Sequence, residues 1–338
     1  MSVGDSRAVL VTGGAGYIGS HACKALAQAD YIPVTVDNFV NGFESAVRWG
    51  PLECADIGDR VRLDEVFRVH QPVAVMHFAA YAYVGESMKD PGNYYRNNVV
   101  NSLTLLEAAR DHGVKRFVFS STCNTYGVPR VTPITEEHVQ LPINPYGASK
   151  LMVERILRDF DSSHGIRSIS LRYFNAAGAD PDLEIGEDHD PETHLIPLVL
   201  MASAVGAKPL EIYGDDYETP DGTCVRDYIH VTDLAAAHLL ALKRLEQGGE
   251  SNAYNLGNGS GFSVRDVIRT AEGVTGHAIP VRTIARRPGD APILVGDATK
   301  ARHELGWRPG HAELSYILET AWGWHCRQGR DDLKTSVG

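Results

Sequence analysis

The stretch Val11-Thr12-Gly13-Gly14-Ala15-Gly16-Tyr17-Ile18-Gly19 decides how this chain folds. It follows an apolar run typical of a strand, residues 8–11, and leads into a segment typical of a helix, residues 18–29. A glycine-rich turn between a strand and a helix lets backbone N–H groups approach a pyrophosphate at the positive end of the helix dipole. The stretch therefore predicts a dinucleotide-binding turn.

A carboxylate follows this turn at the expected distance. A second apolar run, residues 33–36, ends in Asp37, eighteen residues after Gly19. An acidic residue at this place accepts a hydrogen bond from the ribose 2′-hydroxyl of NAD and repels the 2′-phosphate of NADP. Residues 38–41 include no arginine that could hold an extra phosphate. The sequence thus favours NAD as the cofactor.

The composition excludes several classes of protein. The chain has 338 residues, 43% of them hydrophobic and 22% charged, as in a globular protein, and this length favours two unequal lobes. A net charge of −11 argues against a nucleic-acid partner. No signal peptide and no apolar run of membrane-spanning length are visible, so we expect a cytoplasmic protein without a membrane partner.

The cysteine and histidine patterns give no metal signature. The five cysteines are scattered and lack Cys-x-x-Cys spacing, which indicates reduced thiols. The fourteen histidines show no His-Glu-x-x-His pattern. The sequence therefore predicts no metal site.

Strand-like and helix-like segments alternate through the first half of the chain. We expect strands at 8–11, 33–37, 52–54, 73–78, 116–120 and 168–173, and helices near 18–29, 61–69, 94–112 and 146–162. This alternation predicts an α/β fold of the Rossmann type, a doubly wound parallel sheet with helices on both faces. Ligands of such sheets bind at the carboxyl ends of the strands.

The pattern changes after about Asn175, where prolines and acidic residues begin to cluster. We predict an NAD-binding Rossmann domain over residues 1–176 and a smaller C-terminal α/β domain for the substrate over residues 177–338. Residues 253–257 are expected to return to the first domain as a further strand.

Three polar residues suit proton transfer beside a nicotinamide. Tyr146 and Lys150 follow Pro145, which favours a first helical turn, and their spacing of four puts both on one helix face. A free tyrosine, with a pKa of about 10, is a poor base, and we expect the ammonium and a cationic nicotinamide to lower that pKa. Thr122 adds a hydroxyl at the end of the fifth strand. Such a set can move a proton while the nicotinamide moves a hydride.

Motifs along nearly the whole chain, from about Arg7 to Trp324, resemble the extended short-chain dehydrogenase/reductase family, and within it the 4-epimerases of nucleotide sugars. Beyond the residues above, the resemblance rests on segments 77–80, 120–122, 171–175, 221–231, 254–257 and 286–290. It implies a homodimer, through the helices near 94–112 and 146–162. It also implies NAD-dependent, reversible inversion at C4′ of a UDP-sugar through a 4-keto intermediate, with UDP-glucose and UDP-galactose as the pair.

The resemblance also implies roles position by position, with Tyr146 as the base, Lys150 beside the nicotinamide ribose and Thr122 against the sugar. The implied NAD-binding residues are Gly13, Gly16, Tyr17, Ile18, Gly19, Asp37, Asn38, Asp56, Ile57, Phe78, Ala79, Ala80, Asn97, Lys150 and Phe174. The implied UDP-sugar-binding residues, in the second domain and at the strand ends, are Thr122, Asn124, Tyr146, Asn175, His194, Leu195, Tyr213, Arg226, Arg287, Asp290 and Leu294.

Three positions depart from the family pattern. Ala82 stands where a lysine near NAD is frequent, His194 where asparagine is frequent, and Asn124 where a small residue or threonine is usual. The sequence leaves open whether Asn124 is natural or introduced.

The sequence also leaves open which sugar is preferred. Leu294 lies where a tyrosine tends to exclude N-acetyl sugars and a small residue admits them, and Ser121-Thr122-Cys123 is similar to the strand end of epimerases acting on UDP-xylose and UDP-arabinose. A nucleotide-sugar dehydratase would need an acid and a base after Thr122, where Cys123 and Asn124 stand instead. A catalytically silent NAD-binding regulator would lack the tyrosine–lysine pair.

Overall fold

The computed structural model describes residues 7–204, 206–287 and 290–335. Residues 1–6, which belong to the N-terminal segment without a visible signal peptide, lie outside the described residues. Pro288 and Gly289 of the segment 286–290 lie outside them too. None of the helices among the described residues combines the length and the apolar character that crossing a bilayer requires.

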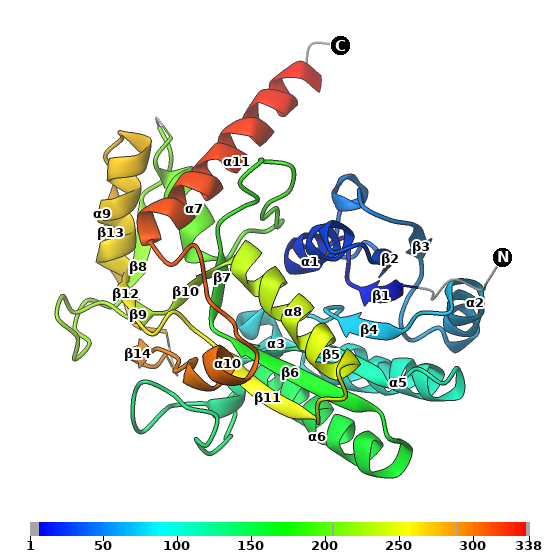
Figure 1. Ribbon diagram of the computed structural model, residues 1–338. Coiled ribbons are helices and arrows are strands. Elements are labelled where there is room, and N and C mark those ends of the chain that lie inside the picture. Colours follow the sequence, from blue (N-terminus) through cyan, green and yellow to red (C-terminus); the bar gives the residue numbers. More distant parts are fainter. Residues whose placement is uncertain (1–6, 205, 288–289, 336–338) are drawn as a thin grey trace.

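Seven parallel strands form the central sheet, in the order β11-β6-β5-β4-β1-β2-β3 (Figure 1). They are β1 (Ala8–Thr12), β2 (Ile32–Asp37), β3 (Leu52–Cys54), β4 (Ala74–His77), β5 (Arg116–Thr122), β6 (Arg167–Tyr173) and β11 (Asn252–Leu256). The chain leaves β1 toward one edge and then returns to β4 on the other side. Ligands of open α/β sheets bind at such a reversal.

Helices cover both faces of this sheet. One face carries α1 (Tyr17–Gln28) and α8 (Val231–Glu246); the other carries α2 (Arg60–His70), α5 (Asn101–Asp111) and α6 (Pro145–His164). Along β1, Val9 and Val11 pack in the first core, whereas Ala8 and Leu10 pack in the second. Because both faces are buried, the strands are continuously apolar. The predicted fold class, a doubly wound α/β sheet, is confirmed.

The helical segment expected near 94–112 is confirmed, but a π-helical turn divides this region. It comprises α4 (Pro91–Tyr95), a π-helical turn η2 (Arg96–Val100) and α5, and α3 (Val84–Lys89) precedes them. Two short 3₁₀ turns, η1 (Glu44–Ala46) and η3 (Cys123–Tyr126), complete the first part of the chain. Single π-turns inside helices frequently occur at functional sites.

The second half of the chain supplies a smaller layer around its own core of apolar residues. Its elements are β7 (Asn175–Ala177), α7 (Leu195–Ala202), β8 (Leu210–Tyr213), β9 (Val225–Arg226), β10 (Tyr228–His230), β12 (Phe262–Ser263), α9 (Val264–Thr275), β13 (Val281–Ile284), β14 (Ile293–Leu294), α10 (Thr299–Glu304) and α11 (Leu314–Thr335). However, α8 and β11 lie against the first sheet. The division at residues 176 and 177 stays a prediction.

Helix α6, which carries Tyr146 and Lys150, has clear local signals at both ends. Pro145 occupies the first helical turn, and the Asn144 side chain accepts a hydrogen bond of 2.8 Å from the Gly147 amide. The helix ends at Gly165, whose left-handed backbone (φ 63°) suits a C-terminal glycine.

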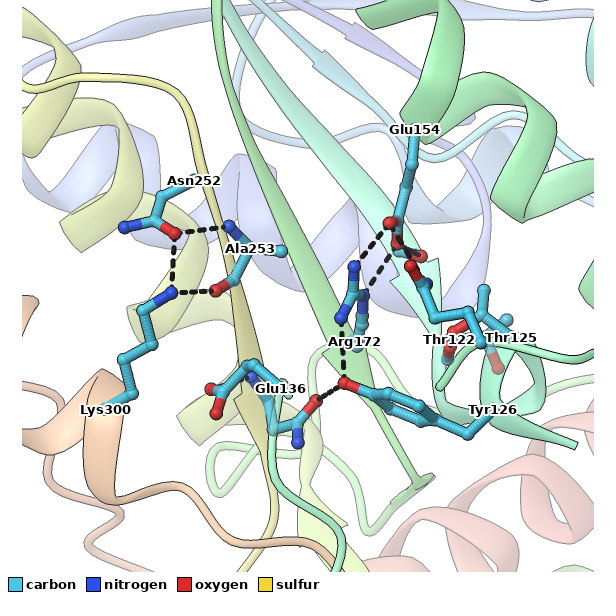
Figure 2. Close-up of polar contacts among 12 residues, drawn as sticks. Thr122, Thr125, Tyr126, Glu136, Glu154, Arg172, Asn252, Ala253 and Lys300 are labelled. Carbon is cyan, nitrogen blue, oxygen red and sulfur yellow. Dashed lines mark hydrogen bonds and ion pairs between the residues drawn. The ribbon is translucent and has the colours of Figure 1, made fainter. Parts of the chain in front are cut away.

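A buried ion pair fixes α6 on the sheet (Figure 2). Glu154 on α6 receives two hydrogen bonds from the guanidinium of Arg172 on β6, of 2.9 and 2.6 Å, and one of 2.5 Å from the hydroxyl of Ser121 on β5. Both charged side chains are about 95% buried. Bidentate pairing satisfies two charges that would be costly to bury alone.

The same guanidinium continues the network toward the edge strand. Arg172 donates to the Tyr126 hydroxyl (2.8 Å), which donates to the side-chain oxygen of Asn255 on β11 (2.8 Å). The Asn255 amide group in turn donates to the Ile134 carbonyl (2.9 Å). The network therefore joins α6, three neighbouring strands and the segment that follows β5.

Replacing Glu154 by glutamine should destabilise the protein strongly. The Glu154→Gln variant keeps the size of the side chain but leaves Arg172 as a buried charge without a counter-ion. We expect the free energy of unfolding to fall by about 3–5 kcal/mol. Urea unfolding of the parent and the variant measures this difference.

The matched control is Asp159→Asn on the same helix. Asp159 faces Arg155 at 3.3 Å, but more than 60% of each side chain is exposed. Exposed pairs of this kind contribute only about 0–1 kcal/mol. Equal losses in the two variants would contradict the importance assigned to the buried pair.

Candidate active site

The glycines of the turn between β1 and α1 have different structural roles. Gly13 has a positive φ of 73°, and a Cβ built on it would lie 2.6 Å from the Ala79 amide nitrogen, so this position admits only glycine. A Cβ on Gly19 would lie 2.1 Å from the Gly13 carbonyl oxygen. Gly16 meets nothing closer than 3.3 Å and begins α1 without a side-chain cap. The first turn of α1 thus offers amides to an anion.

Asp37 lies at the carboxyl end of β2 and faces this turn. Its two oxygens accept hydrogen bonds from the amides of Ala15 (3.0 Å) and Phe39 (2.9 Å). Burial raises the pKa of Asp37, and these amide bonds oppose that shift. A carboxylate has about four acceptor positions, so Asp37 keeps capacity for a further hydroxyl donor.

The next strand ends extend the same edge. Asn38 donates to the Asp56 carboxylate (2.9 Å), which also accepts from the Gly58 amide (2.7 Å). After β4, the amides of Phe78 and Ala79 bind the Thr12 carbonyl at 2.9 and 3.0 Å. These strand ends therefore meet the glycine turn directly, with Ile57 buried and Ala80 half-buried beside them.

Asn98 is a residue of this edge that the sequence analysis missed. Its side chain accepts from the Tyr81 amide (2.8 Å) and donates to the Tyr81 carbonyl (2.9 Å) and to the Ser149 hydroxyl on α6 (3.1 Å). Asn97 donates to it at 3.0 Å. Two consecutive asparagines are unfavourable inside a helix. This pair was the sequence signal that could have pointed to a special role of Asn98.

Thr122, Tyr146 and Lys150 come together at the carboxyl end of β5. Tyr146 and Lys150 are both buried on one face of α6. The Lys150 ammonium donates to the Ser120 carbonyl (2.9 Å) and lies 5.0 Å from the centre of the Phe119 ring. The Thr122 hydroxyl lies close enough to the Tyr146 phenol to act on its pKa.

The pKa of Tyr146 differs from the expectation, which was that Lys150 and a cationic nicotinamide lower it. Burial raises the pKa of Tyr146 well above its usual value, the charge of Tyr173 adds to the rise, and the bond with Thr122 opposes it. Burial likewise lowers the pKa of Lys150 to about 7. Lys150 is not among the groups that act on Tyr146. The chain by itself therefore favours a neutral phenol, and lowering the pKa of Tyr146 requires a further positive charge.

Asn124 orients the hydroxyl of Thr122. The backbone amide of Asn124 and its side-chain amide both donate to Thr122 Oγ1, at 3.2 and 3.1 Å. Because these two bonds use the acceptor positions of the oxygen, the Thr122 hydroxyl keeps its proton as a donor. Asn144, the cap of α6, binds the Asn124 side-chain oxygen at 3.3 Å. Asn124 thus connects the strand end to the start of α6.

Several of the residues predicted to bind the UDP-sugar lie around β9. Arg226 donates to the Ala291 carbonyl (2.9 Å) and to the Asp290 carboxylate (3.2 Å), and it pairs in register with Leu294 on β14. Asn175 donates to the backbone carbonyl of the residue after Arg226, at 3.1 Å.

Other residues predicted to bind the UDP-sugar or NAD, further along the chain, make contacts away from β9. The Arg287 guanidinium stacks 3.7 Å from the centre of the Tyr213 ring, and Phe174 packs against Gly296 at the end of the sheet. Leu195 begins α7, but the preceding His194 turns its Nδ1 toward Glu187, at 2.6 Å. A role of His194 in binding UDP stays a prediction.

A surface hollow of about 710 Å³ lies away from all these residues. Its lining includes Val73, Arg116 and Arg167, which stand at the amino ends of β4, β5 and β6. This is the opposite edge of the sheet from the glycine turn, so the hollow is not the candidate site.

Comparisons with known proteins identify the family. A UDP-glucose 4-epimerase of Rhizobium leguminosarum bv. trifolii is 53% identical over 322 residues, which cover 95% of this chain and 98% of the relative. The structure of UDP-glucose 4-epimerase from Brucella ovis in complex with NAD is 52% identical, with a TM-score of 0.92 over 94% of this chain and 97% of that one.

A UDP-glucose-4-epimerase of Stenotrophomonas maltophila, solved with bound NAD and formylated UDP-arabinopyranose, is 40% identical, with a TM-score of 0.92 over 96% of this chain and 99% of that one. The resemblance read from the motifs is therefore confirmed. The model of the NAD dependent epimerase/dehydratase family matches residues 9–257. Since this match covers well over half of the chain, the chain belongs to the NAD dependent epimerase/dehydratase family.

Proposed function

We propose that this protein catalyses the NAD-dependent, reversible inversion of C4′ in a UDP-sugar, with UDP-glucose and UDP-galactose as the main pair. The observation that carries the proposal is the meeting of Thr122, Tyr146 and Lys150 at the sheet edge that also bears the glycine turn. The names of the relatives, UDP-glucose 4-epimerases over nearly their full length, support the same activity.

The residues present fit a dinucleotide. The uncapped first turn of α1 and the carboxylate of Asp37 suit a pyrophosphate and a ribose. A bound NAD would supply the hydride acceptor and donor that such an inversion requires. We assign NAD binding to Gly13, Gly16, Tyr17, Ile18, Gly19, Asp37, Asn38, Asp56, Ile57, Phe78, Ala79, Ala80, Asn97, Lys150 and Phe174.

The proton chemistry belongs to the side chains at the end of β5. In the proposed mechanism, Tyr146 removes the proton of the sugar 4′-hydroxyl as C4′ becomes a ketone, and returns it when the ketone is reduced from the other face. Thr122, held by Asn124, orients the hydroxyl. Lys150, fixed on the Ser120 carbonyl, holds the ribose end of the cofactor.

The second half of the chain is proposed to anchor UDP while the keto sugar turns over. A guanidinium binds a diphosphate through two parallel hydrogen bonds, and this suits Arg226 and Arg287. The remaining residues assigned to the UDP-sugar are Asn124, Asn175, His194, Leu195, Tyr213, Asp290 and Leu294.

Dehydration is a poorer fit at this site. It needs an acid and a base after Thr122, but the Cys123 thiol is buried, which raises its pKa to about 12, and Asn124 carries an amide. A silent NAD-binding regulator would not need Tyr146 and Lys150 in this arrangement. Epimerisation of UDP-xylose and UDP-arabinose remains an alternative, because one similar enzyme was solved with a formylated UDP-arabinopyranose.

We further propose a cytoplasmic location. All five cysteines are free thiols, as expected in a reducing compartment. Fractionation of the producing cells would test this assignment.

The purified protein should convert UDP-galactose into UDP-glucose without added NAD, because the cycle involves no net oxidation. Tyr146→Phe keeps the ring but removes the base, so turnover should fall by about 10²–10⁴-fold. A coupled assay of UDP-glucose formation measures both rates.

Binding of UDP serves as the control in this experiment, since Tyr146→Phe should leave it nearly unchanged. The absence of activity on every UDP-sugar tested would refute the proposed function. Near-normal turnover in Tyr146→Phe would instead show that another group is the base.

The sugar preference should follow the size of Leu294. We expect kcat/KM to be highest for UDP-galactose and lowest for UDP-N-acetylglucosamine. UDP-xylose should lie within about 10–200-fold of UDP-galactose, because a missing carbon group costs only about 1–3 kcal/mol. Leu294→Ala should raise the value for the N-acetyl sugar. Steady-state kinetics of both proteins test this order, and an N-acetyl sugar as the best substrate of the parent would contradict it.

The protein is also proposed to form a homodimer through the helices around α6. Met152 on α6 is 45% exposed and Val100 on the neighbouring η2 is 56% exposed. Met152→Glu together with Val100→Glu should give a monomeric mass in light scattering. Met201→Glu, at a comparably exposed position on α7, should leave the dimer intact, and a monomeric parent would refute the assignment.

A further inference from the structure

The connection between β7 and α7 gathers four side chains that can bind a metal. They are Glu187, His189, Glu192 and His194, and their ligand atoms all lie within 4.8 Å of one another. From Glu187 Oε1, the distance to Nδ1 is 3.2 Å for His189 and 2.6 Å for His194. His194 Nδ1 lies 3.4 Å from a Glu192 oxygen. In a tetrahedral zinc site with bonds of about 2.0–2.1 Å, neighbouring ligand atoms lie about 3.3 Å apart.

Two atoms of this cluster are buried without a well-formed hydrogen bond. Glu187 Oε1 and His189 Nδ1 are both buried, and neither has a hydrogen-bond partner among the described residues. The Glu187 side chain is 93% buried. Buried polar atoms normally have partners. Here a buried carboxylate oxygen and a buried imidazole nitrogen lie 3.2 Å apart without a hydrogen bond of good geometry to any described residue.

A neighbouring acidic cluster shows how carboxylates are usually neutralised without a metal ion. Asp180, Asp182 and Glu184 also lie close together, but the Lys24 ammonium stands between them, at 2.8, 3.0 and 2.8 Å. In the part of the chain that the structure describes, neither Glu187 nor Glu192 has an ion pair with lysine or arginine. The Asp180 cluster therefore has its own cation, whereas the basic side chains within the Glu187 cluster are its two imidazoles.

We propose that Glu187, His189, Glu192 and His194 bind one Zn²⁺ ion. Two carboxylates neutralise its charge, and imidazole ligands favour zinc over magnesium or calcium. The sequence contains neither Cys-x-x-Cys nor His-Glu-x-x-His, which is why no metal site was predicted from it. The spacing here, Glu-x-His-x-x-Glu-x-His, is neither of these.

Outer contacts hold two of these residues in place. Tyr17 and Tyr83 direct their ring edges at His189, with centroids 6.3 and 5.9 Å away. The Trp324 indole on α11 donates to the Glu187 carbonyl at 3.0 Å. Outer-shell partners of this kind fix the orientation of metal ligands. The ion would join α1, the start of α3 and α11 just ahead of α7. This is a structural role, and it would replace the UDP-sugar contact proposed for His194.

The test measures zinc in the full-length protein after removal of any purification tag. We expect one equivalent of tightly held Zn²⁺ per chain by elemental analysis. After chelation, titration with Zn²⁺ should restore one site, whereas Mg²⁺ at the same concentration should not occupy it. The thermal midpoint should rise on adding Zn²⁺, because a ligand of the folded state stabilises it.

Two variants test the ligands separately. His189→Ala removes one imidazole, and Glu192→Gln keeps an oxygen for the amides of Thr193 and His194, which bind Glu192 at 2.6 and 2.7 Å. Each should weaken zinc binding by more than about 100-fold, since even the loss of an outer-shell partner costs about 10–100-fold. His303→Ala, an exposed histidine on α10, is the matched control and should keep the site.

Circular dichroism verifies that each variant is folded before zinc is measured, and Glu192→Gln decides the test if His189→Ala does not fold. The proposal is overturned if the parent binds no tight equivalent of Zn²⁺, or if Glu192→Gln binds it as tightly as the parent does. It is also overturned if Mg²⁺ occupies the site equally well. None of these readouts depends on epimerase activity, so the two proposals fail or succeed separately.

Discussion

The buried pair of Glu154 and Arg172 is the interaction on which the position of the candidate catalytic groups depends. Glu154 lies eight residues after Tyr146 and four after Lys150 on the same helix, so fixing one carboxylate on β6 fixes the whole face of α6. Ser121, the neighbour of Thr122, binds the same carboxylate. The hydroxyl at the strand end and the phenol on the helix are therefore positioned by one shared group.

Burial also sets the chemical state of the site. It favours the neutral forms of both Tyr146 and Lys150, because a charge in a low-dielectric region lacks the stabilisation of water. In the chain alone, Tyr146, the proposed base, is thus held in its neutral form by its own surroundings. A positive charge delivered next to the phenol would change this state, and a nicotinamide ring carries one.

Local sequence signals predicted most of the fold and the glycine edge of the site. The expected strands agree with the observed ones to within about two residues, because parallel strands buried on both faces are continuously apolar. The turn before α1, Asp37 and the pair on α6 are likewise features of short segments with fixed spacing. Each could be read without knowledge of distant contacts.

Features that depend on distant partners were not visible in the sequence. Asn98 interrupts a regular helix to bind Tyr81 and Ser149, and nothing near it in the chain identifies those partners. Helix α8 was not expected on the first sheet, since its amphipathic pattern does not say which surface it will cover. The orientation of Thr122 by Asn124 and the convergence of Glu187 with two histidines are also set by folded geometry.

The edge strand β11 has a consequence for how this protein is made on the ribosome. The sheet begins at Ala8 but is completed only by Asn252–Leu256, and Asn255 closes the hydrogen-bond network that starts at Glu154. During translation, at about 5–20 residues per second, the growing chain spends several seconds with β6 as an open edge. Open edges attract other strands. Protection of the nascent chain by a chaperone would matter most in the interval between synthesis of β6 and synthesis of β11.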